Sequence, residues 1–278
     1  MLGTRRRAAA MLPQAKDFLD ESEALYALVA PLTEEELSTK TSFKGWTIGN
    51  VIGHLYVWNW AADLTLTDGD AFKEFYKGVI RAARKTGRLT DFENSWLDSL
   101  KGQALIETWR QHYLGMAERF GQADPSKRVK WAGPDMTVRS KITARLMETW
   151  AHAQEVYDQL GRVRINGDRI RNVVILGVNT YGWTFKNRGL ELPGPMPHLR
   201  LTAPSGELWT YGEASEAELI EGQAEEFCQV VTQTRNIADT KLRVMGQVAR
   251  AWMAKAQCFA GGPEEPPAPG VRKVMSKL

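Results

Sequence analysis

Apolar residues recur at helical spacing through most of the first 185 residues, and this periodicity restricts that part of the chain to a helical fold. Thr33 to Glu36 has the sequence of a capping box, Thr47 is a suitable N-cap, and Gly161 is a helix stop. The spacing predicts helices over about 14–32, 48–58, 71–85, 93–100, 102–120, 138–160 and 168–185. We therefore expect a helical bundle over residues 11–190.

The pattern changes after three closely spaced prolines, Pro193, Pro195 and Pro197. Residues 198–202 and 207–211 alternate around a Pro-Ser-Gly turn, which predicts a hairpin. Further predicted elements are a strand, an amphipathic helix and a last helix, at 217–221, 222–234 and 241–259. The sequence thus predicts a mainly α protein with a smaller α+β domain at residues 191–262. Residues 1–10 are interpreted as a disordered or non-native start, with translation beginning at Met1 or Met11, and residues 263–278 as a flexible tail.

Composition and charge exclude several classes of protein. A net charge of +3, spread along the chain, gives no basis for binding nucleic acid or an anionic membrane. No apolar run approaches the roughly 18 residues that a membrane span needs. Arg5, Arg6 and Arg7 precede a short alanine run with no apolar segment after it, which argues against a secretory signal.

The last three residues, Ser276-Lys277-Leu278, match the tripeptide that the peroxisomal import receptor reads. In a eukaryote this ending predicts the peroxisomal matrix, with the import receptor as a partner. In a bacterium the match has no meaning, and a cytoplasmic protein is expected.

The two cysteines, Cys228 and Cys258, are not arranged as a CxxC motif. We interpret both as small buried hydrophobic residues of a protein in a reducing compartment. A disulfide or a reactive thiol is the alternative.

Three side chains have the chemistry of a metal site. Glu148 and His152 are four residues apart on one predicted helix and therefore share a face. His54 lies among apolar residues of another helix. Considered separately, Glu148 and His152 could be two solvent-exposed neighbours on a helix, and His54 could be a histidine packed in the core. Together, two imidazoles and a carboxylate with an open position are typical of catalytic zinc sites, and they also suit nickel or iron.

These residues lie within longer stretches that resemble the DinB-like superfamily. The stretches are Gly45-Trp46-Thr47, Val51 to Leu55, Arg145 to His152, and Asp158, and the branch they resemble is the mycothiol-dependent maleylpyruvate isomerase metal-binding domain. Residues 131–136 and 222–261 resemble a subgroup with a wyosine-base-formation-like C-terminal domain. The resemblance implies a four-helix bundle in which His54, Glu148 and His152 hold a divalent metal. Asn172 and Thr234 depart from the pattern, since relatives are expected to have basic or imidazole side chains there.

The function that follows from the resemblance is thiol chemistry. A bound metal would act as a Lewis acid and stabilise the thiolate of a low-molecular-weight thiol, either mycothiol, as in relatives, or glutathione. We therefore expect a metal- and thiol-dependent isomerase or transferase acting on a small organic electrophile or acid. One alternative is a non-catalytic metal-binding or stress protein. The other is a nucleoside-modification accessory, against which the weak positive charge argues.

Other polar residues are weaker candidates for a functional role. Arg139, Lys141 and Arg145 are candidates to hold an acidic substrate, although a solvated basic face is the favoured interpretation. His112 is interpreted as a surface or packing residue, and His198 as the first residue of a strand. The sequence leaves the oligomeric state open, a homodimer included.

Overall fold

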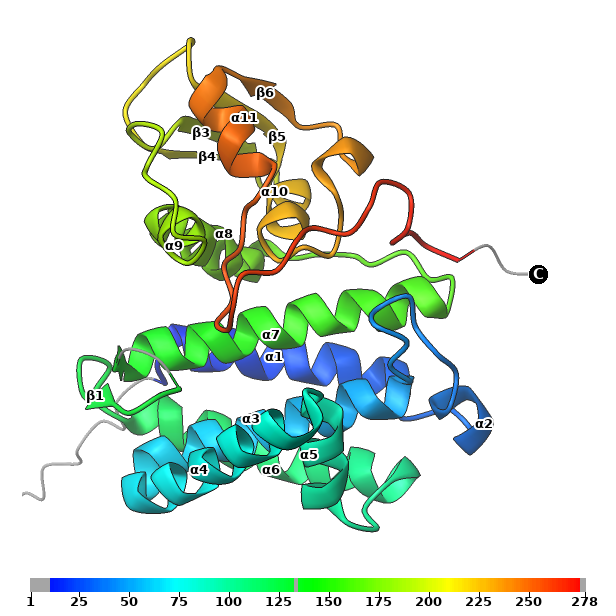
Figure 1. The fold of residues 1–278 in the computed structure, drawn as a ribbon. Coiled ribbons are helices and arrows are strands. Elements are labelled where there is room, and N and C mark those ends of the chain that lie inside the picture. Colours follow the sequence, from blue (N-terminus) through cyan, green and yellow to red (C-terminus); the bar gives the residue numbers. More distant parts are fainter. Residues whose placement is uncertain (1–10, 133–134, 276–278) are drawn as a thin grey trace, which may run out of the picture. The chain divides into compact units, whose positions relative to one another are not determined.

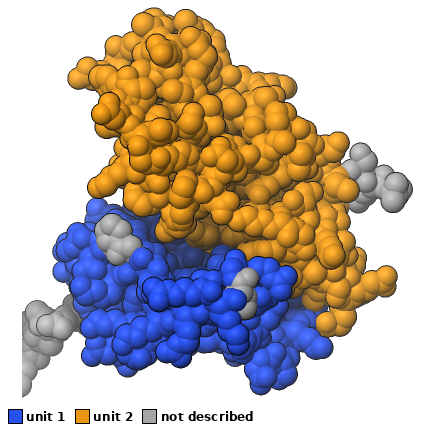
Figure 2. Space-filling model, in the orientation of Figure 1, with its two compact units in different colours: residues 1–30, 52–145 blue, residues 31–51, 146–278 orange. Residues whose placement is uncertain are grey.

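The computed structural model describes residues 11–132 and 135–275, so the predicted start at 1–10 and the terminal tripeptide lie outside the described residues. The mainly α fold class with a small sheet is confirmed (Figure 1). The chain divides into two compact units, drawn in different colours in Figure 2. Unit 1 comprises residues 1–30 and 52–145, and unit 2 comprises residues 31–51 and 146–278. The domain boundary predicted near residue 190 stays a prediction. Among the described residues, no helix is long and apolar enough to cross a membrane.

Unit 1 is a set of helices with a two-stranded ribbon. Helices α3 (Ile48–Thr67) and α7 (Val138–Gln159) each contribute residues to both units. Unit 1 also contains α1 (Pro13–Val29), α4 (Gly69–Thr86), α5 (Leu89–Leu97), α6 (Gly102–Gln122), and the antiparallel strands β1 (Arg128–Val129) and β2 (Met136–Thr137). Helix α1 packs along α6, where Phe18, Leu25, Trp109 and Tyr113 are fully buried. The predicted helical faces therefore form this core.

Unit 2 contains a four-stranded sheet in the order β4-β3-β5-β6. The strands are β3 (His198–Thr202), β4 (Leu208–Tyr211), β5 (Leu219–Gln223) and β6 (Arg243–Met245). The predicted hairpin is confirmed as the antiparallel pair β3–β4, whereas β5 pairs with β3 in parallel. Helix α10 (Ala224–Val231) packs against β3, β5 and α8 (Arg171–Asn179). The remaining helices are α2 (Glu34–Leu37), which has the predicted capping box, η1 (Asp168–Ile170), α9 (Tyr181–Lys186), η2 (Ile237–Asp239) and α11 (Gln247–Met253).

Two helices of unit 2 are shorter than the sequence predicts. The helix expected over 168–185 is divided at Thr180, whose φ of −101° and ψ of 10° end α8, and whose hydroxyl donates to the carbonyl of Leu176. The helix expected over 241–259 is only α11, because Arg243–Met245 pairs instead with β5. Gly246, at a φ of 91°, separates this strand from the helix. For residues 243–245, pairing with a neighbouring strand is therefore more favourable than the helix that their local sequence pattern predicts.

Residues 263–278 were predicted to form a flexible tail, but residues 264, 272 and 275 are hydrogen-bonded to the rest of unit 2. The Glu264 N–H donates to the Gln257 side-chain oxygen at 3.0 Å, and Arg272 donates to the Gln233 carbonyl at 2.7 Å. The Met275 N–H donates to the Asp158 carbonyl at 2.8 Å. Several prolines between these contacts restrict the unfolded chain, which lowers the entropy lost when the segment is ordered.

The interpretation of the cysteines as small buried residues is confirmed, whereas the reducing compartment stays a prediction. Cys228 and Cys258 are both free and buried in unit 2. Burial raises the pKa of each thiol, so neither is a reactive thiolate at neutral pH.

Candidate functional site

In unit 1, His54 is held by a buried carboxylate. It lies on α3 with 8% of its surface exposed, and its Nδ1 is 2.7 Å from Oε1 of Glu93 on α5. The indole N–H of Trp58 donates to the same oxygen at 2.8 Å. Since a carboxylate accepts hydrogen bonds, Nδ1 of His54 is the donor in this contact, which leaves Nε2 as the nitrogen that would coordinate a metal. A carboxylate behind the imidazole is the usual support of a metal-binding histidine.

Glu93 is a residue that the sequence analysis missed. It is 2% exposed, although it lies in a short helix that is otherwise unremarkable in sequence. A signal was present, because Glu93 shares a helical face with Leu89, Trp96 and Leu97. A carboxylate within an apolar face requires a partner.

In unit 2, Glu148 and His152 lie one turn apart on α7, as the spacing predicted. Oε2 of Glu148 is 3.6 Å from Nε2 of His152, and Oε1 of Glu155 is 3.5 Å from Nδ1 of the same ring. Burial disfavours the charged imidazole, but Glu155 and Glu148 outweigh burial and raise the pKa of His152 to about 9. This environment favours positive charge at His152, which a divalent cation could supply in place of the proton.

Two aromatic rings cover His152. Trp46 is stacked on the imidazole, with 5.7 Å between centroids and 8° between planes. Phe43 makes a T-shaped contact with the imidazole, with 5.3 Å between centroids and 71° between planes. Together the two rings limit the access of water to the imidazole and restrict its rotation.

The turn that places these rings explains the Gly-Trp-Thr motif. Lys44 and Gly45 have φ values of 49° and 69°, and the Trp46 N–H donates to the Phe43 carbonyl at 2.8 Å. The Thr47 hydroxyl accepts from the N–H of Asn50 at 3.0 Å, which confirms Thr47 as the cap of α3. Gly45 thus supplies the left-handed conformation, Trp46 the stacked ring and Thr47 the helix start.

The C-terminal end of α7 is fixed within unit 2 by a buried ion pair. Arg235 donates to both carboxylate oxygens of Asp158 at 2.7 Å each. The Arg272 guanidinium lies 4.6 Å from the centroid of Phe43, the ring that contacts His152. Asp158, one of the residues that carry the family resemblance, therefore has a structural role in holding the end of α7.

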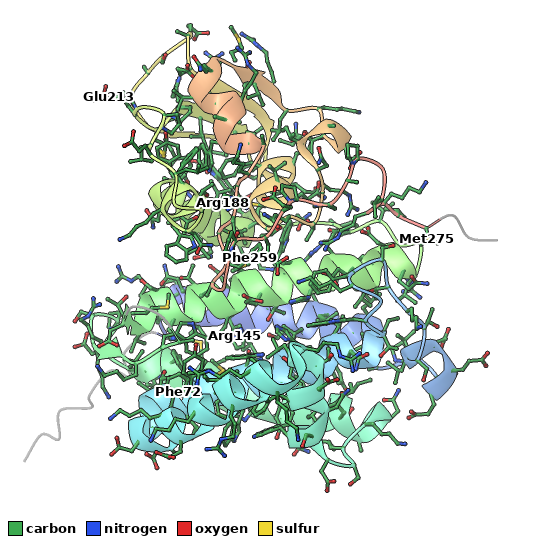
Figure 3. The ribbon with its side chains drawn as sticks, viewed as in Figure 1. Phe72, Arg145, Arg188, Glu213, Phe259 and Met275 are labelled. Carbon is green, nitrogen blue, oxygen red and sulfur yellow. The ribbon has the colours of Figure 1, made fainter. Side chains whose placement is uncertain are left out.

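The basic residues of α7 do not form the solvated face that was the favoured interpretation. Arg139 is exposed, but Lys141 and Arg145 are buried in unit 1. The side chain of Arg145, labelled in Figure 3, donates through Nε to the Asn59 side chain of α3 at 2.9 Å. That interpretation is wrong for these two residues because α7 is apolar over much of its circumference and buries more than one face.

The remaining polar candidates have structural contacts. His112 is half-buried, with its Nε2 3.9 Å from Asp63 and its ring against Tyr56, which confirms a packing role. His198 begins β3, as predicted, and its Nδ1 contacts the backbone of Ser215. Asn172 donates to the Arg169 carbonyl.

Comparison with known proteins is consistent with this architecture. The family model of the mycothiol maleylpyruvate isomerase N-terminal domain matches residues 18–157. Uncharacterized proteins from two strains of Mycobacterium tuberculosis are each 34% identical over 251 residues, covering 90% of this chain and 96% of theirs.

A crystal structure of a mutant of the mycothiol-dependent maleylpyruvate isomerase aligns with a TM-score of 0.51 and 16% identity. The alignment covers 79% of this chain and 88% of that one, and it supports the predicted bundle fold. None of these matches supports the predicted peroxisomal address or the wyosine-like C-terminal domain.

Proposed function

The chain belongs to the mycothiol maleylpyruvate isomerase N-terminal domain family, and on that premise we propose a metal- and thiol-dependent isomerase or transferase. Its substrate would be a small organic electrophile or acid. The proposal places one divalent metal ion on His54, Glu148 and His152, the group of side chains in the described part of the chain that could hold one.

The observation that carries the proposal is a buried carboxylate near Nδ1 of each histidine. Glu93 accepts a hydrogen bond from His54 at 2.7 Å, and Glu155 places its negative charge 3.5 Å from Nδ1 of His152 without a hydrogen bond. Such carboxylates fix the orientation of the imidazole, favour coordination through Nε2 and increase its basicity. Two supported imidazoles and one carboxylate fit a divalent ion, for which we propose zinc, with nickel and iron as alternatives.

When bound, the metal would supply Lewis-acid activation of a thiol or of the substrate. The chain's own residues prepare this chemistry. Glu93 accepts the hydrogen bond of Nδ1 of His54, while Glu155 places negative charge beside the ring of His152. Trp46 and Phe43 exclude water from His152, which strengthens its interaction with charge. For the thiol we propose mycothiol, named for the family, with glutathione as the alternative.

The test combines metal content with turnover. Protein purified without an affinity tag is analysed for metal, then assayed with mycothiol or glutathione on maleylpyruvate and a panel of small electrophiles, with and without chelator. We expect one metal ion per chain and turnover that requires both metal and thiol. His54→Ala should lose both, whereas the control His112→Ala should keep both. Full metal content in His54→Ala would contradict the ligand set. Metal binding without turnover would favour the non-catalytic alternative.

A further inference from the structure

A buried lysine of unit 1 lacks the partners that such a group needs. The Lys141 side chain is fully buried on α7, and its ammonium nitrogen has no hydrogen-bond partner among the residues that the structure describes. The nitrogen lies 3.3 Å from the centroid of the Trp131 ring. Burying an ammonium group without a hydrogen-bonded anion is strongly unfavourable, and the ring offsets only part of that cost. Lys141 is therefore costly to the fold whenever it is protonated.

A permanent cation lies on the same face of α7. Arg145 follows Lys141 by four residues, is 3% exposed and remains charged at all ordinary pH values. Desolvation first, and then repulsion by Arg145, lowers the pKa of Lys141 to about 6. Asp135 opposes this shift, but its carboxylate is already paired with Lys130 at 2.8 Å. At neutral pH the Lys141 amine is therefore mostly neutral.

A series of packed aromatic rings connects Lys141 with His54 inside unit 1. Trp131 contacts Trp58 edge to face at 5.9 Å and is stacked on Phe72 at 5.6 Å. Trp58 in turn donates to the Glu93 oxygen that lies against His54. Phe72 is labelled in Figure 3 on α4. The packed rings of Trp131 and Trp58 thus link Lys141 to the carboxylate that lies against His54, a proposed metal ligand.

We propose that Lys141 and Arg145 bind the carboxylate of a small organic acid. Because a buried amine without a partner favours its neutral form, we expect Lys141 to take up a proton when the acid binds. The proposal rests on the proposed function, for which it defines how the substrate is held. A carboxylate supplies the opposite charge that Lys141 lacks, and opposite charge favours the protonated amine. The ammonium and the guanidinium would then each donate a charge-assisted hydrogen bond to the acid.

Proton uptake can be measured by calorimetry. Malonate is titrated into the full-length, metal-loaded protein at pH 7.5 in two buffers with different ionisation enthalpies. The apparent binding enthalpy should differ between the buffers by an amount that corresponds to nearly one proton taken up. Malonamide, the neutral analogue, should not bind. Inorganic phosphate binding in place of malonate, with the same uptake, would overturn the assignment to a carboxylate.

Variants locate the site. Lys141→Met should bind malonate about tenfold more weakly or worse, without proton uptake, since it loses one charge-assisted hydrogen bond. Lys141→Arg, which cannot titrate, should show no uptake, and Arg139→Met, an exposed cation of the same helix, should behave as the wild type. Unchanged binding and uptake in Lys141→Met would overturn the proposal.

Malonate could also bind the metal, so His54→Ala is measured in parallel. Binding and proton uptake that persist in His54→Ala place the acid at Lys141 independently of the metal. If His54→Ala keeps its metal but Lys141→Met loses malonate binding, the ligand set fails and the carboxylate site stands. Loss of malonate binding in His54→Ala, with Lys141→Met unchanged, would assign malonate to the metal and overturn the carboxylate site.

Discussion

Oε1 of Glu93 lies 2.7 Å from Nδ1 of His54, although the two residues are 39 positions apart in the chain. The oxygen also accepts the indole N–H of Trp58, so its position is fixed from two sides. This contact makes Nδ1 of His54 a hydrogen-bond donor, and Nε2 is therefore the nitrogen that would bind a metal.

Replacing Glu93 should weaken metal binding without removing a ligand. Glu93→Gln keeps the shape of the side chain but loses its charge, so His54 becomes less basic. We expect metal affinity to fall about 10- to 100-fold, as is usual for such supporting residues. Competition with a chromophoric chelator measures the affinity. Glu74→Gln, an exposed carboxylate of α4, is the control and should have no effect. Equal affinities for Glu93→Gln and wild type would argue against a supporting role.

Metal removal should lower the thermal stability of the protein. A ligand that binds only the folded state raises the free energy of unfolding as its concentration increases. The gain is about 4 kcal/mol when the free ligand concentration is a thousand times its dissociation constant. We expect chelation to lower Tm and added zinc to restore it, as followed by scanning calorimetry. His54→Ala should unfold at one temperature whether or not zinc is present. A zinc-dependent shift of normal size in that variant would contradict its place among the ligands.

Lys141→Met should stabilise the protein, and the gain should depend on pH. The pKa of Lys141 is lowered to about 6 in the folded state from 10.5, so the folded protein binds fewer protons than the unfolded chain between these values. The stability of the wild type therefore rises with pH across this window. We expect the variant to gain roughly 1–4 kcal/mol near pH 6 and to lose most of that advantage by pH 10.

Urea unfolding in buffers free of carboxylate, at several pH values, measures this difference. Lys127→Met, which replaces an exposed lysine, should show no comparable gain at any pH. A constant difference between Lys141→Met and wild type would mean that Lys141 titrates normally.

Removal of Arg235 should destabilise unit 2. Arg235→Met leaves the buried Asp158 carboxylate without its bidentate partner, which typically costs about 3–5 kcal/mol. Arg243→Met, which removes an exposed arginine paired with Glu221, should cost about 1 kcal/mol or less. Chemical denaturation compares the two variants. Similar small losses for both would show that the pair does not hold the end of α7.

Much of the secondary structure could be predicted because its causes are local. Helix periodicity, the capping box from Thr33 to Glu36 and the Thr47 cap involve residues within a turn of one another. The Glu148–His152 pair is local in the same sense, since a spacing of four residues places both on one face of any helix. The ligand set that includes His54 stays a proposal, supported by the family and by the carboxylates behind both imidazoles.

Tertiary structure alone decided the features that depend on distant partners. Residues 243–245 form a strand because β5 offers an edge, and Asp158 is neutralised by a residue 77 positions away. The burial of Lys141 depends on which faces of α7 are covered, and helical periodicity does not specify this for a helix that is apolar on several sides. A sequence pattern fixes which residues share a face, but the free energy of burying a charge is set by the groups packed against it.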